Sequence, residues 1–251
     1  VRRMVGATAL GVAGALLVTA SANANDSAKT ILKAMSDYVA NQKTIQVAFD
    51  TDIEVITSDL QKIQFASSGS VLLSRPDKLR ATRTGGYADI ELVFDGKVFT
   101  LYGKNLNSFT QVEAPGSTDQ LFERLRGELG VEMPGSDLLL TKSFDVLMDG
   151  VILPQHIGRG VIDGVECEHL AFRAVETDWQ IWIELGARPI PRKFVITNKG
   201  VNGGPQYTLR IKDWKTDPSV NKDSFAFAPP AGATKVNLSA MPGLDEVPPG
   251  F

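Results

Sequence analysis

DWQIWIELGARPIPRKFVITNK, residues 178–199, indicates the fold more directly than any other stretch of the chain. Apolar and polar residues alternate in both halves, which is typical of two β-strands, and Gly186 and Pro189 mark a turn between them. The residues predicted to face inward are Trp179, Ile181, Ile183 and Leu185 in the first strand and Phe194 and Ile196 in the second. Because aromatic and β-branched residues are densest here, we expect this hairpin at the centre of an antiparallel sheet.

The same alternation extends the predicted sheet in both directions along the chain. Residues 45–55 alternate apolar and mostly acidic positions, as a half-buried antiparallel strand does, and residues 63–73 repeat the apolar half of the pattern. Within the second of these segments, Ser67, Ser68 and Gly69 indicate a bend or a β-bulge. Further strands are predicted at 79–84, 90–94, 98–102, 109–112, 160–162, 165–173, 207–214 and 225–227.

Three helical segments are predicted among these strands. Residues 25–42 carry apolar residues at helical spacing, so an N-terminal helix precedes the first strand. Two near-identical Pro-Gly-Ser segments, at 115–117 and 134–136, each introduce a further amphipathic run, and Ser117 with Gln120 fits a capping box. Amphipathic helices need an apolar surface to cover, so we expect both inserted helices on the concave side of the sheet.

The N-terminal residues indicate export. Arg2 and Arg3 precede an apolar run at 5–20, and residues 22–24, Ala-Asn-Ala, fit the pattern of a cleavage site. We therefore interpret residues 1–24 as a signal peptide cleaved near Ala24, which places the remaining chain in the periplasm. The apolar run is shorter than the roughly 20 residues of a membrane span. An uncleaved anchor is therefore the weaker alternative, and no span is expected after cleavage.

Charge and cysteine content limit the class of protein. The chain has 26 basic and 29 acidic residues, and loss of Arg2 and Arg3 with the signal peptide leaves 24 basic residues. This balance argues against nucleic acid as a partner, because nucleic-acid binding requires a clustered positive surface. Cys167 is the single cysteine, so an exported chain has no internal disulfide and depends on its core for stability.

The side chains that carry most catalytic chemistry form no recognisable motif. The sequence has no Gly-x-Ser-x-Gly elbow, phosphate-binding loop or dinucleotide fingerprint, so we expect neither an enzyme nor a cofactor. Cys167 and His169 share one face of a strand, but no further ligand follows at the spacing of a metal site, and we expect no metal. Glu166 and Glu168 are interpreted as solvated charges on the opposite face of that strand.

Three stretches together resemble a known family. They are the hairpin at 178–199, DGVECEHL at 163–170 and FAFAPPAG at 225–232. These stretches are similar to the DUF2092 family of predicted periplasmic proteins, which resembles the LolA/LolB lipoprotein-localisation superfamily. The resemblance implies a mainly β (α+β) fold, a strongly curved antiparallel half-barrel with an N-terminal helix and two inserted helices covering its concave face. We expect a single domain at 25–236 and a flexible Pro/Gly-rich tail at 237–251.

In that superfamily the concave hollow receives acyl chains or other hydrophobic groups. The resemblance therefore implies a soluble periplasmic protein that binds or carries a hydrophobic ligand, such as a lipid or the acyl chain of a lipoprotein. The inward positions give the predicted ligand-binding residues, which are Phe49, Ile53, Phe65, Phe94, Trp179, Ile181, Ile183, Phe194, Ile196 and Leu209. A packed core without room for a ligand is the alternative interpretation of the same residues.

The second functional hypothesis is an envelope interaction or sensor protein that binds another protein. The superfamily fold also occurs in regulators that bind a membrane-anchored partner, and in such a protein the apolar hollow serves as core. Trp182 faces away from Trp179 along the strand, so it is either packed under a loop or exposed for contact. Trp182 and the edge strands would form the contact surface.

Overall fold

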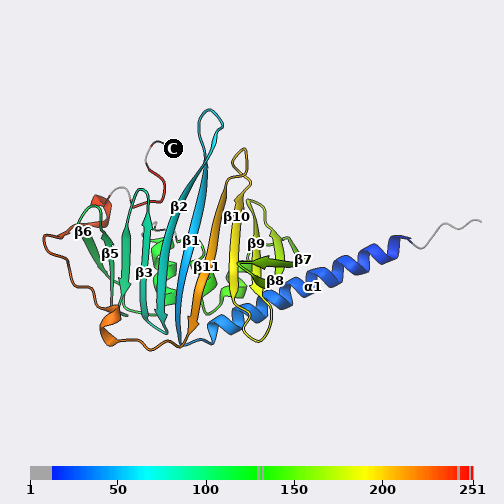
Figure 1. Ribbon diagram of the computed structural model, residues 1–251, viewed down its shortest axis with the longest axis horizontal. Coiled ribbons are helices and arrows are strands. Elements are labelled where there is room, and N and C mark those ends of the chain that lie inside the picture. The colour runs from blue at the N-terminus through cyan, green and yellow to red at the C-terminus, as the bar shows by residue number, and fades with distance from the viewer. Residues whose placement is uncertain (1–12, 129–130, 132, 242–243, 249, 251) are drawn as a thin grey trace, which may run out of the picture.

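The computed structural model describes residues 13–128, 131, 133–241, 244–248 and 250. Its main feature is one twelve-stranded sheet that curves around the helices (Figure 1). The strands are β1 (Thr44–Ile56), β2 (Lys62–Ser74), β3 (Lys78–Gly85), β4 (Ile90–Phe94), β5 (Val98–Gly103), β6 (Ser108–Glu113), β7 (Leu153–Ile162), β8 (Val165–Arg173), β9 (Thr177–Glu184), β10 (Pro191–Asn198), β11 (Gln206–Thr216) and β12 (Thr234–Lys235). The helices are α1 (Ala13–Ala40), α2 (Thr118–Gly127) and α3 (Ser143–Met148), with 3₁₀ turns η1 (Ser136–Leu139), η2 (Lys222–Phe225) and η3 (Leu238–Ala240).

The strand order is β12-β6-β5-β4-β3-β2-β1-β11-β10-β9-β8-β7. All neighbouring strands are antiparallel except β12, which pairs in parallel with β6. The middle of the sheet is formed by β2, β1 and β11, so β11 joins the second half of the chain to the first. The 178–199 hairpin is β9–β10 and lies nearer the β7 edge. The predicted central position of the hairpin was therefore wrong. The centre is instead formed where β1 pairs with β11, and local sequence patterns do not show which distant segments pair.

The prediction of a β-bulge at residues 67–69 is also wrong, and the alternative of a bend there stays a prediction. β2 pairs with β1 from Lys62 to Ser74 without a shift of register, whereas β1 and β11 shift register between Gln46 and Ala48. Gly69 instead allows the side chain of Phe49 to lie close to the backbone of β2. A Cβ atom at this position would lie 2.4 Å from the ring of Phe49, so only glycine lets that ring lie across β2.

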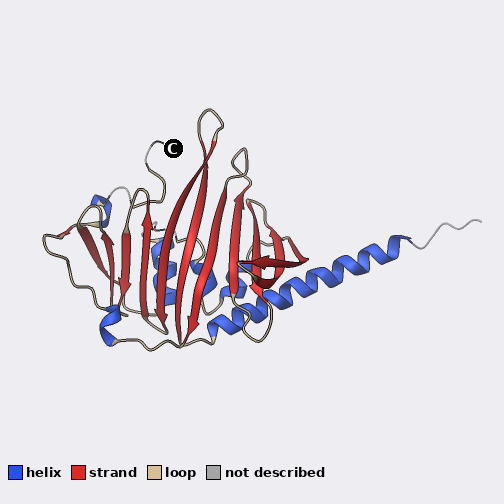
Figure 2. Cartoon of the chain, in the orientation of Figure 1, coloured by secondary structure: helices blue, strands red, loops and turns tan. Residues whose placement is uncertain are grey.

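α2, α3 and the C-terminal part of α1 lie on the concave side of the sheet (Figure 2). α1 presents Ala28, Leu32, Met35 and Val39 to the core, at the spacing of one helical face. α2 begins with the predicted capping box of Ser117 and Gln120 and buries Leu121, Phe122 and Leu125. The mainly β half-barrel with an N-terminal helix and inserted helices is thus confirmed.

Three local predictions differ from the structure. α1 already includes Ala13, the first residue that the structure describes, and continues through the predicted cleavage site, whereas the predicted helix began at 25. The second inserted helix is split into η1 and α3, because Leu140 adopts an extended backbone between them. Residues 225–227 form no strand: Phe225 ends η2, and Phe227 packs its ring on Tyr102 and Phe109.

Candidate functional site

Cross-strand pairing places the predicted ligand-binding residues on the concave face. Six of them are buried in the main core, namely Phe94, Trp179, Ile181, Ile183, Phe194 and Leu209. The other four are half-buried, namely Phe49, Ile53, Phe65 and Ile196. The single set predicted from the sequence therefore separates into a packed part and a part that keeps accessible apolar surface.

Trp179 anchors the packed part. Its indole stacks on the ring of Phe172 with centroids 3.9 Å apart and an interplanar angle of 11°, and it meets Phe194 edge-on at 5.7 Å. Such contacts between offset or edge-on rings add to the free energy of simple burial. Only 7% of the Trp179 surface is exposed, so this residue belongs mainly to the core.

Half-buried residues on four strands form one registered row on the concave face, which continues into buried Trp179 on a fifth strand. Phe65 on β2 pairs with Ile53 on β1, which pairs with Tyr207 on β11, followed by Ile196 on β10 and Trp179 on β9. We call these five residues the apolar row. All except Trp179 are half-buried, so the row offers a continuous apolar strip beside the packed core.

Tyr207 places a hydroxyl group in the middle of the apolar row. Its hydroxyl donates a hydrogen bond to the carbonyl oxygen of Pro134 at 3.3 Å. Burial, with a smaller contribution from the nearby Glu246 carboxylate, raises the pKa of this phenol well above its usual value. Tyr207 therefore remains a neutral hydrogen-bond donor.

A polar group interrupts the concave face next to the apolar row. Thr51 pairs with Ser67, and their hydroxyl oxygens lie 2.6 Å apart although both residues are buried. Arg83 on β3 lies on the same face, opposite Gly69 of β2. We call Thr51, Ser67 and Arg83 the polar site.

The C-terminal residues meet the polar site. The Glu246 Oε2 atom accepts hydrogen bonds from Thr51 Oγ1 at 3.0 Å and from Ser67 Oγ at 3.1 Å, and its Oε1 lies 3.5 Å from Arg83 Nη1. Arg83 also donates to the carbonyl oxygen of Leu244. The expected flexibility of residues 237–251 stays a prediction, but the described residues 244–248 include these contacts with the sheet.

Sequence reasoning missed the polar site, although a signal for part of it was available. Thr51 occupies an inward position between Phe49 and Ile53, where the alternation calls for an apolar residue. Ser67 interrupts β2 in the same way after Phe65. No local pattern connects either residue with Glu246, which is far away in sequence.

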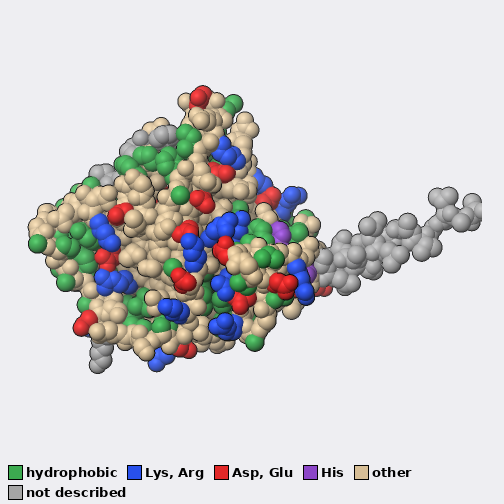
Figure 3. All heavy atoms as spheres, viewed as in Figure 1, with side chains coloured by type: hydrophobic (Ala, Val, Ile, Leu, Met, Phe, Trp, Pro, Cys, Tyr) green, Lys and Arg blue, Asp and Glu red, His purple; other side chains and the backbone are tan. Residues whose placement is uncertain are grey.

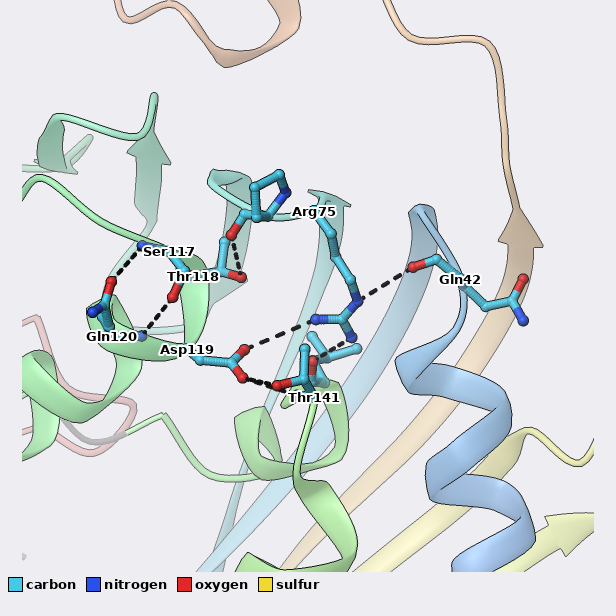
Figure 4. Close-up of polar contacts among 9 residues, drawn as sticks. Gln42, Arg75, Ser117, Thr118, Asp119, Gln120 and Thr141 are labelled. Carbon is cyan, nitrogen blue, oxygen red and sulfur yellow. Dashed lines mark hydrogen bonds and ion pairs between the residues drawn. The ribbon is translucent and has the colours of Figure 1, made fainter.

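Arg75 fastens the helices to the base of the sheet (Figure 4). Its Nε donates to the carbonyl oxygen of Gln42 at 3.2 Å, and its Nη2 donates to that of Leu139 at 2.6 Å. Nη1 lies 3.9 Å from the carboxylate of Asp119, an ion pair without a hydrogen bond. Burial lowers the pKa of Arg75 and the Asp119 charge opposes this. Asp119 in turn accepts from the backbone and hydroxyl of Thr141, so one guanidinium joins the α1–β1 connection, α2 and the end of η1.

A second polar connection fastens α1 to the edge of the sheet. His156 on β7 places Nε2 2.6 Å from a carboxylate oxygen of Glu168 and Nδ1 3.2 Å from Ser27 Oγ. The His156 ring thus lies within hydrogen-bond distance of one group on α1 and one on β8. The prediction that Glu168 is a solvated charge was wrong, because its side chain is only 17% exposed and paired.

The convex face carries the residues that alternate outward. Cys167 and His169 share this face as predicted, and His169 stacks on Trp182 with ring centroids 4.1 Å apart. The ammonium group of Lys193 also lies over the Trp182 ring, 5.0 Å from its centroid. Burial is the main cause that lowers the pKa of His169, so its neutral form is favoured beside this cation. Trp182 is thus half-buried among strand side chains rather than under a loop.

Charged residues of both signs lie over the middle of the sheet on the face opposite α2 and α3 (Figure 3). Among them, Lys212 pairs with Asp50, and this hydrogen bond is the main cause that holds the pKa of Asp50 below its usual value. A groove of about 570 Å³ on this side is lined mainly by charged residues, including Asp163, Arg192 and Arg210. The groove is unsuited to an acyl chain, which leaves the concave face as the apolar candidate.

Cys167 should be almost inert toward thiol reagents in the native protein. Its side chain is fully buried, and burial raises the pKa of the thiol. Burial thus lowers both the fraction of reactive thiolate and the access of a reagent to it, so labelling by a disulfide reagent at pH 8 should be more than about tenfold slower than in urea. Cys167→Ser/Val175→Cys is the matched control, since Val175 is 72% exposed. Equal native and unfolded rates for Cys167 would contradict its burial.

Comparison with solved structures finds a similar fold in one mycobacterial protein. LprF from Mycobacterium bovis is similar with a TM-score of 0.50 and 12% identity, over 78% of this chain and 96% of that chain. An uncharacterized conserved protein from Thermus thermophilus has a TM-score of 0.49 and 14% identity, over 84% of this chain and 98% of that chain. The lipoprotein LppX of Mycobacterium tuberculosis has a TM-score of 0.41 and 16% identity, over 79% of this chain and 100% of that chain. No curated protein matches the sequence significantly.

The family comparison covers most of the chain. Among the residues that the structure describes, no helix combines the length and hydropathy needed to cross a bilayer. A family model described as "Predicted periplasmic protein (DUF2092)" matches residues 28–239, which include all three stretches quoted for the resemblance. The chain therefore belongs to the DUF2092 family of predicted periplasmic proteins.

Proposed function

We propose that this protein binds a hydrophobic group, such as a lipid or the acyl chain of a lipoprotein, against its concave face in the periplasm. The observation that carries the proposal is the apolar row, which runs from buried Trp179 as a half-buried strip across β10, β11, β1 and β2. Membership of the DUF2092 family supports a periplasmic location for the protein. The half-barrel fold, shared with LprF, supplies the concave surface. We place the function in binding or carrying, without a catalytic step.

The physical basis of the proposed binding is burial of apolar surface. Each methylene group removed from water contributes about 0.8 kcal/mol, so even part of an acyl chain laid along the row would offset the cost of ordering it. A ligand that reaches beyond the half-buried row into the packed part of the concave face would require α2, η1 and α3 to move away from the sheet, because these elements cover that part. Arg75 and the chain segments it joins would set how easily they move.

A substitution in the apolar row tests this proposal. Ile53→Asn should weaken binding of a fluorescent acyl probe by about tenfold or more, because it removes apolar contact and leaves an amide to be desolvated. Asp52→Asn is the matched control, since Asp52 lies on the opposite face of the same strand. If the wild type binds no acyl probe, or if both variants bind it equally well, the apolar row is not the site.

A second candidate function is binding of another protein in the cell envelope. The observation that favours it is the edge strand β7, on which Ile157 and Val161 are 53% and 64% exposed. An exposed apolar edge strand can pair with another chain. Photo-crosslinking from position 161 in cells would decide between the two functions. A single stoichiometric protein adduct favours the partner, and a diffuse pattern counts against it.

A further inference from the structure

We propose that the polar site, Thr51, Ser67 and Arg83, is a carboxylate-binding site that Glu246 occupies in the unliganded protein, and that the ligand is a long-chain carboxylic acid whose head group replaces Glu246. This inference rests on the proposed function and narrows it to one ligand class. It assigns the head group to the polar site and the apolar tail to the apolar row. The C-terminal residues then act as an internal competitor for the head group.

The polar site has the composition of an anion site. Two hydroxyl groups converge on one carboxylate oxygen at 3.0 and 3.1 Å, and a guanidinium lies 3.5 Å from the other. Hydroxyl and guanidinium donors are the groups that bind carboxylates, and such charge-assisted hydrogen bonds are stronger than neutral ones. Thr51 and Ser67 are only 1% and 7% exposed, so an anion here is held where water competes weakly.

Polar residues at these positions have no role in a purely packed core. Thr51 and Ser67 interrupt the apolar alternation of β1 and β2, and the Nε of Arg83 is buried without a hydrogen-bond partner among the described residues. Burying polar groups is costly unless they are paired. The two hydroxyls lie 2.6 Å apart, and Glu246, outside the sheet, accepts a hydrogen bond from each of them. The site is thus built on three strands but completed by a group that the sheet does not contain.

The polar site lies two residues along the strands from the apolar row, so one amphiphilic molecule could contact both. Thr51 precedes Ile53 by two residues on β1, and Ser67 follows Phe65 by two on β2, so head site and row are about 7 Å apart along the strands. A carboxylate at the polar site would therefore direct an attached alkyl chain along the apolar row. This arrangement fits a single molecule with both parts.

The residues around Glu246 hold it in place without burying it fully. Leu244 approaches Gly103 and lines a small cavity of about 150 Å³ with Tyr87 and Leu106. Glu246 itself keeps 12% of its side-chain surface exposed. A carboxylate tethered in this way competes with a free ligand at a high effective concentration. Removing its charge should therefore strengthen ligand binding.

The test compares a fluorescent long-chain acid with its methyl ester. Glu246→Gln should bind the acid about tenfold more tightly than the wild type does, because the internal competitor is weakened. Binding of the ester should change little. Asp245→Asn is the matched control, because Asp245 is an exposed carboxylate one residue away, and it should leave both affinities unchanged. Arg83→Met should abolish the preference for acid over ester, and Thr51→Val should reduce it, which provides a second variant if Arg83→Met folds poorly.

The outcomes separate this inference from the proposed function. If acid and ester bind alike in the wild type, and Glu246→Gln changes neither affinity, the carboxylate site is refuted while binding of a hydrophobic group stands. If neither probe binds to any variant, both ideas fail. If Asp245→Asn strengthens acid binding as much as Glu246→Gln does, the effect comes from overall charge, which also refutes the site.

Discussion

Replacing Trp179 by alanine should lower the free energy of unfolding by about 3–5 kcal/mol, the range typical of large aromatic side chains removed from a core. The expectation follows from its geometry, since Trp179 stacks on Phe172 at 3.9 Å and meets Phe194 at 5.7 Å while only 7% of its surface is exposed. The loss would leave a cavity between β8 and β10 that these packed neighbours cannot close. Urea unfolding followed by circular dichroism measures the change in the free energy of unfolding.

Trp182 provides the matched control three residues away. It projects from the convex face of the same strand, is half-buried, and has one stacked partner, His169. Trp182→Ala should cost only about 0.5–1.5 kcal/mol, the magnitude of an aromatic pair near a surface. Equal losses for the two tryptophans would mean that the concave and convex faces of β9 have been assigned wrongly.

Replacing Arg75 by methionine should cost about 2–4 kcal/mol, because it leaves the carbonyl oxygens of Gln42 and Leu139 without their donors and the Asp119 carboxylate without its cation. The side chain is only 11% exposed, so water replaces the lost partners poorly. Arg75→Lys should recover little of the loss, since one ammonium group cannot take over the geometry of the guanidinium fork. Hydrogen exchange should also become faster in α2 and η1 than in the central strands.

Arg173→Met is the control for Arg75. Arg173 pairs with Asp178 at 3.4 Å, but its side chain is 58% exposed, and exposed pairs contribute little. We expect a change within about 0.5 kcal/mol. If Arg75→Met is as mild as this control, or if exchange in α2 and η1 is unaltered, then Arg75 does not hold the helices against the sheet.

The sequence predicted the parts of the fold that depend on local periodicity. Alternation assigned Trp179, Ile181 and Ile183 to one face and Trp182 to the other, and the structure places them so. The family resemblance supplied the curvature of the sheet and the position of the helices. Strand order was harder, because the pairing of β1 with β11 depends on which distant segments fit together rather than on any single segment.

The candidate site was predictable only in its apolar part. Ile53 and Phe65 follow from alternation, whereas their status as half-buried residues depends on how far the helices extend over them. Thr51 shows how a polar residue at an inward position can mark a site, provided that the break in the pattern is noticed. The partnership of Arg83 with Glu246 joins β3 to the end of the chain, and only the folded structure brings them together.

The most direct test of the central claim is identification of lipid on the protein purified from the cell envelope without detergent. Native mass spectrometry, followed by extraction and lipid analysis, would show any bound amphiphile and its head group. We predict a bound hydrophobic molecule in the wild type that is depleted in Ile53→Asn and retained in Asp52→Asn. A wild-type protein that is consistently empty, and that also takes up no acyl chain when offered one, would contradict the account.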